Sequence, residues 1–202
     1  MARGLFVVFE GVDACGKSTQ ARRVATARGA RFVFEPGDTP MGEDLRRWVL
    51  DAAAPMTPAT EALLMLTDRS HHVTTVIEPT LARGESVVAD RFAASTLAYQ
   101  GYGRGVDLAD LRAATHLAIG ECEPDLTVLI DISLEVANER RERDHRDRFE
   151  AEDLHFHERV RDGYLELAAA SRSWVVVDGE GTFEEVDAAV DVHLGRLDWR
   201  RD

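Results

Sequence analysis

Lysine is almost absent from this chain of 202 residues: of its 24 lysine and arginine residues, only Lys17 is a lysine. With 37 acidic residues the formal net charge is −13, which would repel a polyanion over most of the surface. We therefore expect no nucleic-acid partner. A phosphorylated small molecule is compatible with this charge, because a pocket needs only a few converging cations. The one retained lysine indicates a position where the planar guanidinium of arginine cannot replace a compact ammonium group.

Cysteine and long apolar runs are scarce as well. Cys15 and Cys122 are too few for a disulfide framework, and their spacing fits no zinc site. No stretch approaches the roughly 20 consecutive apolar residues of a membrane span. Residues 1–10 lack the long apolar segment and the cleavage site of an export signal. The sequence thus predicts a soluble cytoplasmic protein with no membrane partner.

Apolar residues recur instead in five short runs, at residues 5–9, 31–34, 86–89, 126–130 and 174–177. Longer segments of helical periodicity lie between these runs. Strands that alternate with helices favour an α/β fold, with a five-stranded parallel sheet flanked by helices on both faces. A chain of this length, with 45% hydrophobic residues, suffices for one such domain, and we assign residues 1–202 to it.

A phosphate-binding motif follows the first apolar run. Residues 11–18, GVDACGKS, match the pattern G-x-x-x-x-G-K-[ST] and open a helical segment. The two glycines permit a tight loop whose backbone N–H groups point at phosphates. Lys17 would reach the β- and γ-phosphates of ATP, and the Ser18 hydroxyl would hold Mg²⁺. The residues expected to bind ATP are Gly11, Val12, Asp13, Ala14, Cys15, Gly16, Lys17, Ser18 and Thr19.

This loop specifies a nucleotide but no particular reaction. A regulatory GTPase also needs a guanine-reading Asn-Lys-x-Asp segment, and the chain has no second lysine to supply it. Kinases, other ATPases and passive nucleotide binders remain.

A second group of polar residues follows the third apolar run and begins with Asp90 and Arg91. Residues just beyond the carboxyl end of a parallel strand face the ligand crevice. The Asp90 carboxylate can organise Mg²⁺ or the acceptor, and the Arg91 guanidinium can hold an acceptor phosphate. Both residues are therefore candidates for the catalytic site.

Four motifs, in order and with matched spacing, make the chain similar to thymidylate kinase over about residues 5–170. They are Phe9-Glu10-Gly11-Val12-Asp13, the segment from Glu35-Pro36-Gly37 to Leu45-Arg46, Asp68-Arg69, and the segment from Asp90-Arg91 to Tyr99-Gln100-Gly101. The resemblance implies a P-loop nucleoside-monophosphate kinase fold, ATP as donor, dTMP as acceptor and dTDP as product. It also implies a homodimer, with the helices near residues 60–82 at the interface.

The resemblance assigns roles on the acceptor side. Arg46 and Arg91 would hold the dTMP phosphate, and Arg69 would hydrogen-bond the thymine. Asp13 would take the sugar 3′-hydroxyl, and Tyr99 would crowd the 2′ position and so favour deoxyribose. The remaining residues expected around the base are Met65, Ser95, Thr96 and Gln100.

Thymidylate kinases place a catalytic arginine either in the phosphate loop or in a lid. Ala14 occupies the loop position here, which excludes the first form. The charged stretch at about residues 139–153 resembles the basic lid of the second form. Arg143 and Arg148, with Arg141 next, would close over ATP, exclude water and neutralise charge on the transferring phosphoryl group.

Three positions depart from the usual pattern of the family. Phe34 stands where an arginine is usual, Asp38 replaces a second glycine, and Met65 replaces a phenylalanine that stacks on the base. They leave open a kinase for another pyrimidine monophosphate, such as dUMP or dCMP. A non-catalytic nucleotide-binding module is a further alternative.

Overall fold

A five-stranded parallel sheet forms the centre of the computed structural model, which describes residues 3–140 and 147–199. Its strand order is β2-β3-β1-β4-β5, and each neighbouring pair is parallel. The predicted α/β fold is confirmed. The strands are β1 (Phe6–Glu10), β2 (Arg31–Phe34), β3 (Val87–Asp90), β4 (Leu126–Asp131) and β5 (Trp174–Asp178).

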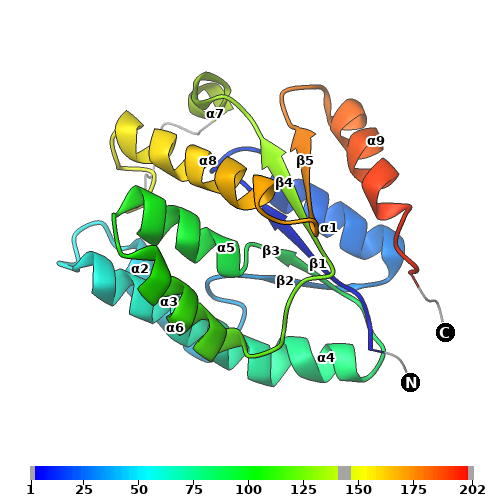
Figure 1. The fold of residues 1–202 in the computed structure, drawn as a ribbon, viewed down its shortest axis with the longest axis horizontal. Coiled ribbons are helices and arrows are strands. Elements are labelled where there is room, and N and C mark those ends of the chain that lie inside the picture. Colours follow the sequence, from blue (N-terminus) through cyan, green and yellow to red (C-terminus); the bar gives the residue numbers. More distant parts are fainter. Residues whose placement is uncertain (1–2, 141–146, 200–202) are drawn as a thin grey trace.

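Helices connect the strands and cover both faces of the sheet (Figure 1). Within the described residues they are α1 (Lys17–Arg28), α2 (Pro40–Leu50), α3 (Pro58–His72), α4 (Glu78–Ala82), α5 (Ala93–Thr96), α6 (Leu108–Ile119), α7 (Leu134–Arg140), α8 (Leu154–Ala169) and α9 (Phe183–Leu194), with π-helical turns η1 (Val73–Ile77) and η2 (Leu97–Gly103). None of these helices is long and apolar enough to cross a membrane.

The strand β1 is buried along its whole length because helices cover it from both sides. Successive side chains of a strand point to opposite faces. Val7 and Phe9 join the core cluster that contains residues of α1 and α9, whereas Phe6 and Val8 join the cluster that contains residues of α3, α4 and α6. Figure 1 shows α1 and α9 on one side of the sheet, and α3, α6 and α8 on the other.

The carboxyl ends of the two central strands lie side by side. Parallel pairing places Phe9 of β1 opposite Asp90 of β3. The segments that follow these strands therefore start at the same edge of the sheet, where ligands bind in folds of this kind. This register brings residues 11–18 close to Arg91 although about 80 positions separate them in the sequence.

Candidate active site

The loop between β1 and α1 has the geometry of an anion-binding site. Gly11 has φ 145°, and a Cβ there would lie 2.5 Å from the carbonyl oxygen of Ile130, so the position requires glycine. Gly16, with φ 91°, caps α1 without a side-chain hydrogen bond to the first turn. The N–H groups of that turn thus stay available for a phosphate, at the positive end of the helix dipole.

Lys17 lies folded against this loop. Its side chain is buried, and Nζ is 3.3 Å from the carbonyl oxygen of Val12 and 3.7 Å from Oδ1 of Asp13. The ammonium group therefore lies beside the loop at which the phosphates would bind. Ser18, the next residue, is exposed at the helix N-terminus.

Arg91 connects this loop to the acceptor segment. Its Nη2 atom lies 2.5 Å from Oδ1 of Asp13 and donates to the Tyr99 hydroxyl at 3.1 Å. Its Nη1 atom donates to Ser95 Oγ and to the Tyr164 hydroxyl, each at 3.1 Å. Burial opposes the charge of Arg91, but Tyr99 and Asp13 raise its pKa well above the usual value. The guanidinium is therefore a fixed positive charge between the two halves of the site.

Glu10 and Tyr164 belong to the same network, and neither was predicted as a site residue. The buried Glu10 carboxylate accepts from the backbone N–H of Phe92 at 2.9 Å, from Ser95 Oγ at 2.7 Å and from the Tyr164 hydroxyl at 3.0 Å. Burial raises the pKa of Glu10. Glu10 could have been identified from the sequence, because it directly precedes the phosphate-binding motif. Tyr164 lies on α8, and no local pattern marks it.

Asp90 and Ser18 offer a donor set that suits Mg²⁺. Oδ1 of Asp90 is buried and has no hydrogen-bond partner among the described residues. No group of three or more His, Cys, Asp or Glu residues in that part of the chain could hold a metal by itself. Mg²⁺ typically takes one or two protein oxygens together with substrate phosphates and water. The carboxylate of Asp90 and the hydroxyl of Ser18 fit that requirement.

A cavity of about 90 Å³ next to Arg91 brings most of the predicted acceptor residues together. It is smaller than the roughly 300–1,000 Å³ of typical ligand pockets. The predicted residues that line it are Asp13, Arg46, Met65, Arg91, Ser95 and Tyr99, and the unpredicted ones are Glu35, Pro36, Leu50, Asp147 and Phe149.

Arg46 reaches this cavity from α2. Thr39 caps that helix by accepting from the backbone N–H of Gly42 at 3.0 Å, and Pro40 occupies its first turn. Arg46 Nη1 donates to the carbonyl oxygen of Pro36 at 2.8 Å. A Cβ at Gly37, where φ is 115°, would lie 2.8 Å from Cδ of Arg46. The loop before α2 thus holds the second guanidinium of the acceptor site.

Arg69, Thr96 and Gln100 lie behind the cavity and do not line it. The Arg69 side chain donates from Nε to Glu35 at 2.8 Å, from Nη1 to Thr96 Oγ1 at 2.6 Å and from Nη2 to the carbonyl oxygen of Phe92 at 2.9 Å. Gln100 donates to Glu61 at 3.0 Å. Their roles around the base remain predictions.

His72 is a second buried cation, beside Arg69, behind the loop that precedes α2. Its Nδ1 lies 3.0 Å from Glu35 Oε1 and its Nε2 lies 3.1 Å from Asp38 Oδ2. Burial opposes protonation, but the hydrogen bonds to Asp38 and Glu35 outweigh it and raise the pKa of His72 to about 9. Asp38 is one of the three unusual positions in the sequence. Here it completes an ion pair that glycine could not form.

The predicted lid falls partly outside the described residues, which include neither Arg141 nor Arg143. Arg148 is described. Its backbone N–H donates to the carbonyl oxygen of Leu50 at 3.1 Å, and its Nη2 donates to the carbonyl oxygens of Asp51, at 2.8 Å, and Ala54. Arg148 therefore attaches the end of the predicted lid to the loop between α2 and α3. Its role at ATP remains a prediction.

The parallel sheet, the phosphate loop at its central strand and the two arginines across from that loop define a P-loop kinase of the nucleoside-monophosphate type. A family model for thymidylate kinase matches residues 9–190. The chain belongs to the thymidylate kinase family. Phosphoryl transfer from ATP to a nucleotide is the chemistry of this family.

Individual relatives agree with this assignment. A thymidylate kinase of Geobacter sulfurreducens is 43% identical, with 96% of this chain and 98% of the relative covered. One from Desulforudis audaxviator is 48% identical, covering 88% of this chain and 84% of the relative. The crystal structure of thymidylate kinase from Ehrlichia chaffeensis superimposes with a TM-score of 0.79 at 28% identity, over 96% of this chain and 99% of that one.

Proposed function

We propose that this chain transfers the γ-phosphoryl group of ATP to dTMP, giving dTDP and ADP, and that its acceptor phosphate binds between Arg46 and Arg91. The observation that carries the proposal is the position of Arg91, which reaches the phosphate loop through Asp13 and the acceptor segment through Ser95 and Tyr99. A single guanidinium therefore adjoins both the donor and the acceptor positions.

Catalysis in this arrangement is mainly positioning and charge neutralisation. The backbone N–H groups of residues 11–18 hold the triphosphate, and Lys17 swings from Val12 and Asp13 to the β- and γ-phosphates. The attacking oxygen of the acceptor phosphate then lies in line with the bond that breaks. The reaction forms no covalent enzyme intermediate.

Mg²⁺ would be held by Ser18 and Asp90 together with phosphate oxygens, where it would neutralise charge on the β- and γ-phosphates. Asp90 fits this role because its buried Oδ1 has no partner among the described residues. Arginines of the lid, at about residues 139–153, complete the charge neutralisation. Arg143 and Arg148 are the first candidates and Arg141 is the next. The lid and the rest of the chain form a single catalytic domain.

The acceptor sugar and base lie along the 90 Å³ cavity, which opens when the nucleotide binds. Asp13 takes the 3′-hydroxyl, and Tyr99, whose hydroxyl lies 2.9 Å from Asp13 Oδ2, closes the space beside C2′. Met65 contacts the base through its polarisable thioether. Arg69 hydrogen-bonds the thymine, and Ser95, Thr96 and Gln100 complete the surroundings of the base.

A homodimer would cover the apolar groove between α3 and α6. Leu63 is 62% exposed and Leu117 is 86% exposed, and Met41 and Leu66 line the same groove. Contiguous exposed apolar side chains mark interaction surfaces. We infer that a second copy of the chain covers this groove. Replacing Leu117 with aspartate should then shift the mass measured by light scattering from dimer to monomer. An unchanged mass would place the interface elsewhere.

A coupled ADP-release assay across nucleoside monophosphates tests the function. We expect kcat/KM for dTMP to exceed the values for dUMP, dCMP and AMP by at least about tenfold, since the cavity selects both base and sugar. Turnover of dUMP or dCMP that matches or exceeds that of dTMP would favour the other pyrimidine monophosphates. ATP binding without ADP release in the presence of any of them would indicate a non-catalytic module.

A further inference from the structure

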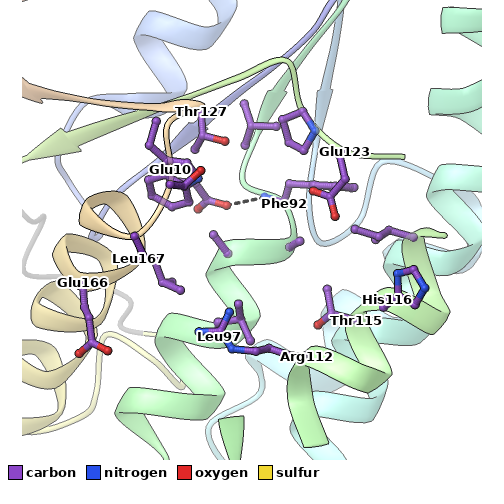
Figure 2. A pocket seen from close by; sticks show the side chains of 18 of the residues that line it. Glu10, Phe92, Leu97, Arg112, Thr115, His116, Glu123, Thr127, Glu166 and Leu167 are labelled. Atoms are coloured by element: carbon purple, nitrogen blue, oxygen red, sulfur yellow. Dashed lines mark hydrogen bonds between the residues drawn. The ribbon is translucent and has the colours of Figure 1, made fainter. Parts of the chain in front are cut away.

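A cavity of about 410 Å³ lies on one face of the sheet, between α6 and α8. Figure 2 shows Thr115 and His116 of α6 on one wall, Glu166 and Leu167 of α8 on the opposite wall, and Thr127 of β4 on the sheet side. The volume falls within the roughly 300–1,000 Å³ range of small-molecule sites. None of the functions assigned above uses this space.

The interior of this cavity is mainly apolar. Polar side chains, among them Thr115, interrupt the apolar surface. Thr115 is 6% exposed, and its Oγ1 has no hydrogen-bond partner among residues 3–140 and 147–199. An unpaired buried hydroxyl is destabilising, and a bound molecule that pairs with it would remove that cost. The cavity therefore suits an apolar body that carries a hydrogen-bonding group. Apolar residues that line it include Val8, Phe92, Leu97, Ile119, Leu167 and Trp174.

The charge around the opening disfavours an anionic ligand. The exposed carboxylates of Glu123 and Glu166 line the cavity. Among the described residues that line it, Arg112 is the one arginine. The last turns of both α6 and α8 also border the cavity, which places the negative ends of two helix dipoles there. A nucleotide or free phosphate is therefore a poor fit, and a protonated amine is a good one.

The inner wall of the cavity is shared with the acceptor site. Glu10 and Phe92 both line the cavity, and Glu10 accepts a hydrogen bond from the Phe92 backbone at 2.9 Å, drawn as a dashed line in Figure 2. The same carboxylate accepts from Ser95 Oγ, which in turn accepts from Arg91 Nη1. A ligand that displaces Phe92 would therefore shift the Glu10 carboxylate and the Ser95 hydroxyl, and through them the position of Arg91.

We propose that the cavity between α6 and α8 binds a compact apolar amine, and that the bound amine alters the affinity of the acceptor site while leaving the ATP site unchanged. The coupling to the acceptor rests on the function proposed above. The binding itself is independent of it.

Binding can be measured with two small probes that share a ring and a chain length, 2-phenylethylamine and the anion 3-phenylpropanoate. We expect the amine to bind with a Kd on the order of 1 mM, at least about threefold more tightly than the anion. A crystal soaked with the amine should show it between α6 and α8. An affinity for the anion equal to that for the amine would overturn the charge assignment. Failure of the amine to saturate the protein by about 10 mM would overturn the site.

Two variants localise the binding. Thr115→Leu extends into the open cavity and should abolish amine binding, whereas Thr115→Val keeps the side-chain shape, lacks the hydroxyl and should weaken binding severalfold. The double variant Glu123→Gln, Glu166→Gln changes only exposed side chains and should remove the preference for the amine. Unchanged amine affinity in Thr115→Leu, or a preference that survives the double variant, would contradict the proposal.

The coupling has its own measurement. At a saturating concentration of 2-phenylethylamine the KM for dTMP should change at least about twofold, and the KM for ATP should not. The Thr115→Leu variant, tested at the same concentration, should show neither change. An unchanged KM for dTMP in the wild-type chain would overturn the coupling. Absence of dTMP turnover would overturn the proposed function and leave the binding measurements intact.

Discussion

The donor side and the acceptor side of this active site are built differently. The donor side is eight consecutive residues, 11–18, whose backbone N–H groups and single lysine face the phosphates. The acceptor side is a wall of side chains from separate elements, in which Arg91 contacts Asp13, Ser95, Tyr99 and Tyr164. A backbone site tolerates many side chains, whereas interlocked buried charges leave an unpaired partner whenever one is removed.

The largest expected effect is on the donor side. Lys17→Ala removes the one ammonium directed at the transferring phosphates, and we expect kcat to fall about 100- to 1,000-fold. The melting temperature should change little, because Lys17 makes only a 3.3 Å hydrogen bond to Val12 and a 3.7 Å ion pair with Asp13. Steady-state kinetics and thermal unfolding check both expectations.

Lys17→Arg is the matched control for that variant. It keeps the charge but not the compact ammonium, and it should recover only part of the lost turnover. Near-normal kcat for Lys17→Ala would contradict the assigned role.

On the acceptor side, Arg91→Met should affect both binding and stability. Loss of the guanidinium removes the phosphate contact and the hydrogen bonds that Asp13 and three hydroxyl groups accept from Arg91. We expect the KM for dTMP to rise about 10- to 100-fold, and the free energy of unfolding to fall by about 1–3 kcal/mol. Arg46→Met, which breaks only the hydrogen bond to Pro36, should raise the KM with a smaller loss of stability.

A larger loss of unfolding free energy in Arg46→Met than in Arg91→Met would contradict this expectation. The two variants should be measured in parallel by dTMP kinetics and urea unfolding.

The pH dependence of stability reports on the cluster behind the acceptor loop. The pKa of His72 is raised from 6.5 to about 9 in the folded chain, so His72 contributes stability that is complete below about pH 6.5 and is lost as pH rises through about 9. Asp38, Glu35, Asp68 and Arg69 surround it. Between pH 6.5 and 9 the free energy of unfolding should fall on the order of 2 kcal/mol.

His72→Gln should flatten that fall, and Asp38→Gly should reduce it while leaving the fold unchanged. Urea unfolding at several pH values measures the slope. A slope that His72→Gln leaves unaltered would show that another group titrates in this range.

The smallest effect is expected at Ala14, in the donor loop. Its φ of 65° lies in the left-handed region, which costs a residue with a Cβ roughly 1 kcal/mol. Ala14→Gly should raise the free energy of unfolding by about 0.5 kcal/mol. Stability lowered by the glycine would indicate that the Ala14 methyl group makes favourable contacts that exceed the backbone strain.

The two sides also differ in how far the sequence predicts them. The position of the donor loop between a strand and a helix could be predicted, because its geometry depends on glycines at fixed spacing next to a strand. The parallel five-stranded sheet followed from the alternation of apolar runs. On the acceptor side, local chemistry indicates Asp90 and Arg91 because they follow a strand end, whereas Arg46, Met65 and Tyr99 were predicted only through the family resemblance. Glu10 belongs to the first of the four motifs, but its hydrogen-bond partners Phe92, Ser95 and Tyr164 lie far away in the sequence.

Other acceptor residues have no local signal at all. Tyr164 reaches Arg91 from α8, more than 70 positions away, and His72 finds Asp38 across two helices. The Arg69 guanidinium pairs with Glu35, Thr96 and Phe92, which no local pattern indicates. Such pairings are set by tertiary packing, and a single sequence does not encode them in any short pattern.

Calorimetric titration of each substrate into Lys17→Ala and Arg91→Met tests the central claim most directly, because it separates donor binding from acceptor binding. We predict that Lys17→Ala retains dTMP affinity within about twofold while Arg91→Met loses at least about tenfold. Arg91→Met should in turn bind ATP more tightly than Lys17→Ala does. Loss of dTMP binding in Lys17→Ala together with its retention in Arg91→Met would contradict the account.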